Sequence, residues 1–170
     1  MKRPCQPLPD GRGSEAGAEL RASASGFPIC HCCSVAGPKS NPILAIAAEA
    51  REFAGLLRHA SEVETLNWPL SFARKALIGG RPWVLAANGP GPRLAHEAAW
   101  TGCGMTAVRA VVSTGYCGGL DPELAVGDIF AATGVRGGSG AGGYAVMPVA
   151  APHSGLLLSV DRVAVTQAEK

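Results

Sequence analysis

Two glycine-containing segments have the composition of ligand-binding turns. NGPGP, residues 88–92, brings small residues and backbone amides to the start of an expected helix, where a phosphate or a sugar hydroxyl can bind. TGYCGG, residues 114–119, follows an apolar run, and its glycines let the backbone approach a ligand closely because they carry no Cβ. Either segment alone is equally compatible with a tight turn that binds nothing.

Cysteine chemistry is less well supported. Cys117 has no positioned histidine beside it, so we interpret it as a small buried residue and not as a nucleophile. The cluster Cys30-His31-Cys32-Cys33 lacks the Cys-x₂₋₄-Cys spacing that tetrahedral zinc favours. No apolar run follows the basic start of the chain, so we expect no export signal and reduced thiols. We therefore expect no metal site and no cofactor.

The chain changes character at Pro42. Residues 1–41 are rich in Pro, Gly, Ser and Ala and show neither a helical nor a strand period. Such a segment cannot bury enough apolar surface to offset the entropy that ordering would cost. We therefore predict a disordered or low-complexity extension over 1–41 and one domain over 42–170.

The first half of this domain alternates strands and helices. Residues 43–47 are apolar without polar alternation, which suits a strand covered on both faces. Residues 49–59 repeat apolar side chains at helical spacing. Gly79-Gly80 predicts a turn between two short strands, the second at 83–87. Pro92 suits the first position of a helix, which we expect Gly102 to end.

The second half continues the pattern with strands expected over 107–113, 127–133 and 156–160, and with a flexible loop over 134–143. Strand–helix alternation favours an α/β domain with a largely parallel sheet. In such sheets ligands bind beyond the carboxyl ends of the strands. Residues 48–49, 88–91 and 114–119 occupy that edge.

The second glycine segment becomes specific when it is read with the residues that follow it. STGYCGGLDPELAVGDI, residues 113–129, closely resembles the central motif of purine nucleoside phosphorylases and of methylthioadenosine/S-adenosylhomocysteine nucleosidases. AIAAEA (45–50), NGPGP and LLSVDRVAVTQAEK (157–170) are similar to other family segments in the right order. LDPEL and SVDRV are also similar to the hopanoid-associated phosphorylase branch, which implies an adenine nucleoside carried on a lipid.

This resemblance implies a fold and a reaction. The fold is α/β: a phosphorylase/hydrolase-like three-layer domain with a mixed, largely parallel central sheet, C-terminally incomplete. The reaction is cleavage of a nucleoside N-glycosidic bond. Glu49 matches the nucleosidase glutamate that activates the attacking water. Without this match, a glutamate favoured by the helix dipole would be the preferred interpretation. The implied substrate-binding residues are Asn88, Gly89, Gly91, Tyr116, Cys117 and Gly118.

Hydrolysis and phosphorolysis both occur in the family. Some of its phosphorylases hold phosphate with an arginine before the glycine turn and a serine within it, where this chain has Ser113 and Tyr116. That departure favours water over phosphate as the attacking group, although Arg51 or Arg93 could supply a cation. The expected partner is a small-molecule nucleoside, with phosphate as the alternative co-substrate and a homo-oligomer compatible with the family.

Complete family members carry two later features, a Met-Glu pair that holds the ribose hydroxyls and an Asp that protonates the leaving purine. The sequence contains no counterpart of either before Lys170, so we expect a truncated and poorly active domain. Two hypotheses stay open: the N-terminal part of a nucleosidase or phosphorylase, or a non-catalytic nucleoside-binding or assembly module.

Composition excludes other classes of function. Hydrophobic residues make up 47% of the chain, charged residues 16%, and the formal net charge is +2. This balance implies neither nucleic acid nor an anionic membrane as a partner. The longest apolar stretches, 43–48 and 107–112, fall short of the roughly 20 residues that cross a bilayer. We expect a cytoplasmic protein.

Overall fold

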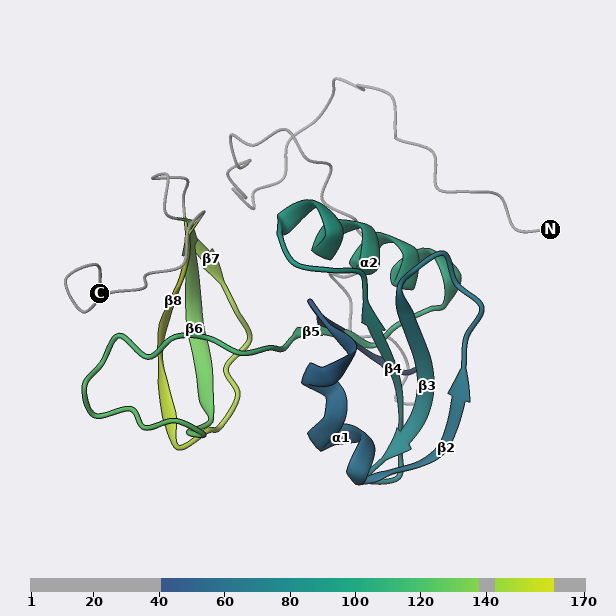
Figure 1. The fold of residues 1–170 in the computed structure, drawn as a ribbon, viewed down its shortest axis with the longest axis horizontal. Coiled ribbons are helices and arrows are strands. Elements are labelled where there is room, and N and C mark those ends of the chain that lie inside the picture. Colours follow the sequence, from purple (N-terminus) through teal and green to yellow (C-terminus); the bar gives the residue numbers. More distant parts are fainter. Residues whose placement is uncertain (1–40, 138–142, 161–170) are drawn as a thin grey trace, which may run out of the picture. The chain divides into compact units, whose positions relative to one another are not determined.

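The computed structural model describes residues 41–137 and 143–160. These residues fall into two compact units, one ending at Tyr116 and one beginning at Cys117. The first unit holds a five-stranded sheet in the order β2-β3-β4-β1-β5, and the second a three-stranded sheet in the order β7-β6-β8 (Figure 1). Of the extension predicted for 1–41, only Asn41 is among the described residues. Residues 161–170, the end of the last segment that resembles the family, also lie outside them.

The central strand of the first unit is β1 (Ile43–Ala47). It runs parallel to β4 (Arg81–Ala87) on one side and to β5 (Ala110–Ser113) on the other. Residues 44–47 are buried without exception. Burial on both faces is why the sequence of this strand shows no polar alternation.

Two antiparallel strands extend the sheet beyond β4. β3 (Phe72–Ile78) joins β4 through the predicted Gly79-Gly80 turn, where φ is +59° and +70°, as a two-residue hairpin turn requires. β2 (Ala60–Thr65) forms the outer edge and is bulged around Glu62. We did not predict β2, because its largely exposed side chains carry no apolar pattern. The mixed sheet with a parallel centre confirms the predicted α/β class.

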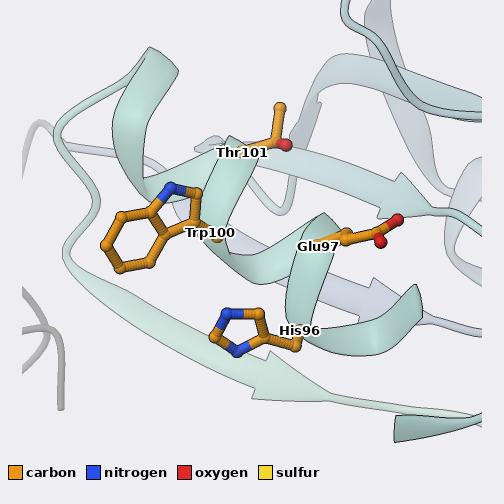
Figure 2. Close-up of a pocket in the computed structure, with 4 residues that line it drawn as sticks. All are labelled: His96, Glu97, Trp100 and Thr101. Atoms are coloured by element: carbon orange, nitrogen blue, oxygen red, sulfur yellow. The ribbon is translucent and has the colours of Figure 1, made fainter. Parts of the chain in front are cut away.

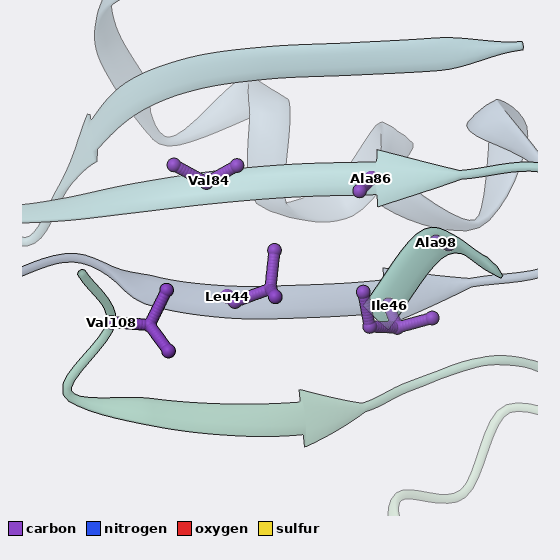
Figure 3. Packing of buried hydrophobic residues seen from close by; sticks show 6 residues of the cluster. All are labelled: Leu44, Ile46, Val84, Ala86, Ala98 and Val108. Carbon is purple, nitrogen blue, oxygen red and sulfur yellow. The ribbon is translucent and has the colours of Figure 1, made fainter. Parts of the chain in front are cut away.

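Helices cover the sheet on both faces. The predicted helix over 49–59 is a 3₁₀ turn, η2 (Ala50–Phe53), followed by α1 (Ala54–Arg58). Phe53 packs with alternate residues of β1, and Ala98 of α2 (Pro92–Met105) packs with the others. Figure 3 shows the second of these clusters. Because successive strand residues point to opposite sides, the two clusters make the sheet the middle of three layers.

Gly102 does not end its helix, so that prediction is wrong. α2 continues to Met105, and Gly102 is buried within it. A Cβ at position 102 would lie 2.5 Å from Cδ2 of Leu44. The glycine therefore permits a close approach between helix and sheet instead of stopping the helix.

The second unit is built on β6 (Phe130–Gly137), which pairs antiparallel with β7 (Gly143–Ala145) and parallel with β8 (His153–Ser159). The flexible loop predicted over 134–143 is wrong for 134–137, which continue β6, and for 143, which begins β7; residues 138–142 lie outside the described residues. A Cβ at Gly134 would lie 3.1 Å from Cδ2 of Leu156. This glycine also serves close packing.

Across the described ranges, the helices are all too short or too polar to span a membrane.

Candidate active site

The three parallel strands bring their carboxyl ends to one edge of the first sheet. Residue 48 follows β1 in the middle, Asn88 follows β4, and Thr114 follows β5. Backbone hydrogen bonds join these segments: the amide of Gly89 donates to the carbonyl of Ala48 at 2.9 Å, and the amide of Thr114 donates to the carbonyl of Ile46 at 2.9 Å. The segments expected at this edge are therefore neighbours as far as Thr114.

Glu49 stands at the start of η2 with an extended backbone, φ −131° and ψ 150°. Its side chain makes no capping hydrogen bond, and its Oε2 lies 2.6 Å from Nε of Arg51. The Glu49 side chain is 46% exposed and that of Arg51 is 74% exposed. At this exposure the carboxylate is accessible to solvent, and an ion pair of this kind contributes little to stability.

A second carboxylate, that of Glu52, lies closer to the glycine turn. Its Oε2 accepts a hydrogen bond from the amide of Ala48 at 3.0 Å. The same oxygen would lie 3.0 Å from a Cβ placed on Gly115. Glu52 therefore bridges the end of β1 and the turn after β5. Glu52 was not among the residues expected in the site, and its place three residues after Glu49 was the signal available in the sequence.

The NGPGP turn is constrained along its length. Gly89 and Gly91 have φ of +111° and +98°, which side chains with a Cβ rarely adopt. Pro92 begins α2, as predicted. The side-chain amide of Asn88 is engaged by the protein: Oδ1 accepts from the amide of Ser71 at 3.2 Å, and Nδ2 donates to Oε2 of Glu97 at 3.1 Å.

The remaining expected site residues are Tyr116, Cys117 and Gly118, which are consecutive in the sequence and are divided between the two units. Tyr116 is the last residue of the first unit and is 78% exposed. Cys117 and Gly118 belong to the second unit. Cys117 is an exposed free thiol, so the prediction that it is buried is wrong. Residues 115–120 belong to no helix or strand and are exposed, so a small side chain there has no core to enter.

A shallow depression on α2 is lined by His96, Glu97, Trp100 and Thr101 (Figure 2). The rings of His96 and Trp100 are stacked with centroids 6.0 Å apart. Glu97 lines this depression and also accepts the hydrogen bond from the side chain of Asn88. Within the described ranges, no cluster of His, Cys, Asp or Glu has a metal-binding arrangement; the cluster at 30–33 lies outside them.

Comparison with known proteins identifies the family. Residues 42–168 match the family described as the phosphorylase superfamily. A comparison with curated proteins finds no match. Three solved structures illustrate the fold, and all are 5′-methylthioadenosine/S-adenosylhomocysteine or S-adenosylhomocysteine nucleosidases.

The Neisseria meningitidis enzyme, in complex with methylthio-immucillin-A, is 24% identical with a TM-score of 0.63 over 72% of this chain and 65% of its own. The Streptococcus pyogenes enzyme, in complex with 5-methylthiotubericidin, is 17% identical with a TM-score of 0.68. The match covers 76% of this chain and 67% of that enzyme. The Colwellia psychrerythraea enzyme, in complex with adenine, is 28% identical with a TM-score of 0.53. The match covers 57% of this chain and 40% of that enzyme. The aligned part of the chain thus spans between 40% and 67% of these relatives. With 42–168 matched to the family, the chain belongs to the phosphorylase superfamily.

Proposed function

We propose that this chain takes part in hydrolysis of the N-glycosidic bond of a purine nucleoside. The observation that carries the proposal is the carboxylate of Glu52 at the end of β1, within reach of the Gly115 turn, in a chain of the phosphorylase superfamily. Relatives of the same fold are nucleosidases bound to nucleoside analogues or adenine. We therefore take an adenine nucleoside with a small 5′ substituent, such as methylthioadenosine, as the substrate class.

The chemistry needs a carboxylate in two ways. As the bond between C1′ and the purine nitrogen lengthens, positive charge develops on the sugar ring, and a nearby carboxylate stabilises it. The same type of group accepts a proton from the water whose oxygen bonds to C1′, while the bonding electrons leave with the purine. The departing purine takes up a proton from solvent water, which balances the proton that the carboxylate accepts.

Glu49 and Glu52 are the two candidates for this carboxylate. Glu49 is the family-matched candidate from the sequence, but its side chain turns to the exposed Arg51. Glu52 is held by a backbone amide at the sheet edge. We favour Glu52 as the general base on this geometry. The variants Glu49→Gln and Glu52→Gln separate the two candidates. The variant that removes the general base should lower the rate of adenine release by about 10²- to 10⁴-fold.

Water is favoured over phosphate by the surroundings of the two candidate cations. Arg51 contacts Glu49, and Arg93 contacts Glu97 four residues further along α2. Each guanidinium is thus partly neutralised by a neighbouring carboxylate, which weakens it as a phosphate ligand. The contacts expected of Asn88, Gly89 and Gly91 with the nucleoside, and those of Tyr116, Cys117 and Gly118, stay predictions.

The test is adenine release from methylthioadenosine by the 170-residue chain, with and without added phosphate. We expect release that does not require phosphate and that Glu52→Gln abolishes. Strict phosphate dependence would refute hydrolysis. Binding of adenine without any release would refute catalysis by this chain and support a nucleoside-binding module instead.

A further inference from the structure

The Asn88 side chain holds together three parts of the first unit. Ser71, which immediately precedes β3, donates its amide to Oδ1 of Asn88 at 3.2 Å and its hydroxyl to the carbonyl of Ala87 at 2.7 Å. On its other side, Asn88 donates Nδ2 to Oε2 of Glu97 at 3.1 Å. The amide thereby continues the β3–β4 ladder past its last pair and ties it to α2.

The chemistry of these two partners determines which way the amide points. Ser71 offers an N–H donor, and Glu97 offers a carboxylate that only accepts. Rotating the amide by half a turn would set Nδ2 against the Ser71 N–H and Oδ1 against the Glu97 carboxylate. Both contacts would then be repulsive, so a single orientation is stable.

Glu97 is itself oriented by a second contact. Its Oε1 pairs with Nη1 of Arg93, which leaves Oε2 for Asn88. The four-residue spacing places Arg93 and Glu97 on one face of α2. The two oxygens therefore have separate partners, and Oε2 is the one that faces Asn88.

Fixing Asn88 also affects the candidate active site. The next residue, Gly89, donates its amide to the carbonyl of Ala48, and the amide of Ala48 donates to Glu52. A continuous path of hydrogen bonds and peptide units thus runs from Glu97 to the carboxylate of Glu52. Glu97 lies outside this edge and was not among the residues expected in the site.

We propose that Glu97 is a positioning residue that locks the Asn88 amide and, through it, the glycine turn at residues 88–91. Its effect on ligand binding rests on the proposed function. Its effect on the turn does not.

Four variants of the 170-residue chain test the proposal. Glu97→Ala removes the acceptor, whereas Glu97→Gln keeps an oxygen that can accept from Asn88. Asn88→Asp places two carboxylates opposite each other. Asn88→Asp combined with Glu97→Gln exchanges the two groups, so that a side-chain NH₂ again faces a carboxylate. Glu64→Gln on the outer strand β2 is the matched control for removal of one negative charge.

The first measurement is independent of any ligand: ¹⁵N–¹H spectra of the Asn88 side-chain NH₂ and of the Gly89 amide. We expect both signals to shift or broaden in Glu97→Ala and to stay near their wild-type positions in Glu97→Gln and Glu64→Gln. In the double variant we expect the Gly89 signal to return to its wild-type position. Unchanged signals in Glu97→Ala would overturn the proposal.

The second measurement is the dissociation constant for adenine, with the melting temperature recorded in parallel. We expect Glu97→Ala and Asn88→Asp to weaken binding by about tenfold, the low end for a hydrogen bond to a charged group, and the double variant to restore it. A double variant as weak as Asn88→Asp would mean that the Asn88 amide meets the ligand directly and would overturn the positioning role. If wild type binds no adenine or methylthioadenosine, the proposed function fails, and the spectra alone decide the role of Glu97.

Discussion

Replacing Gly102 by alanine should destabilise the first unit, although alanine is the better helix former. The added Cβ would lie 2.5 Å from Cδ2, 2.9 Å from Cδ1 and 3.3 Å from Cγ of Leu44. Leu44 is fully buried in the central strand, so its side chain has no open space into which it can move. Overpacking of this kind costs roughly 1–3 kcal/mol, whereas the gain in helix propensity is at most about 1 kcal/mol. With the full gain in propensity, we expect a net loss of up to about 2 kcal/mol.

The assay is urea unfolding followed by circular dichroism, with Gly104→Ala as the matched control. Gly104 lies in the same helix, and a Cβ there would meet nothing within 4 Å. This control should be neutral or gain up to about 1 kcal/mol from helix propensity.

A compensating variant isolates the contact responsible. Leu44→Val removes both methyl carbons that the new Cβ would strike, so Gly102→Ala should cost less in that background than in wild type. If Gly102→Ala matches Gly104→Ala, or if its cost is the same in both backgrounds, close packing against Leu44 is not the cause of the loss.

Three further predictions follow from the same geometry. Gly115→Ala should lower adenine release by at least about tenfold, with little change in melting temperature, because the new Cβ would crowd the carboxylate of Glu52; wild-type turnover would contradict this. Glu62→Gly should raise the free energy of unfolding by up to about 1 kcal/mol, since φ at this position is +53°, and a lowered urea midpoint would count against it. Phe53→Ala should cost about 3–5 kcal/mol in urea unfolding because the ring is fully buried, and a loss below about 1 kcal/mol would be inconsistent with its place in the core.

Local patterns in the sequence determined much of the first unit. The unbroken apolar run at 43–47 predicts a strand buried on both faces, and the structure places it at the centre of the sheet. Gly79-Gly80 predicts a hairpin turn, and Pro92 predicts the start of a helix; both are confirmed. These signals are reliable because each depends on the backbone preferences of a few adjacent residues. The resemblance at 113–129 identified the superfamily, which the match over 42–168 confirms.

Tertiary contacts decided the rest. Gly102 and Gly134 look like a helix end and a loop, but each makes room for a leucine that is distant in the sequence. The same is true of the site: Glu49 and Glu52 are close in the sequence, yet only Glu52 reaches the Ala48 amide and the neighbourhood of Gly115. From the sequence alone come the buried central strand, the Gly79-Gly80 turn and the start of α2 at Pro92, because each depends on the backbone preferences of adjacent residues. Only the folded chain determined which side chains meet, because those contacts depend on segments that the sequence keeps far apart.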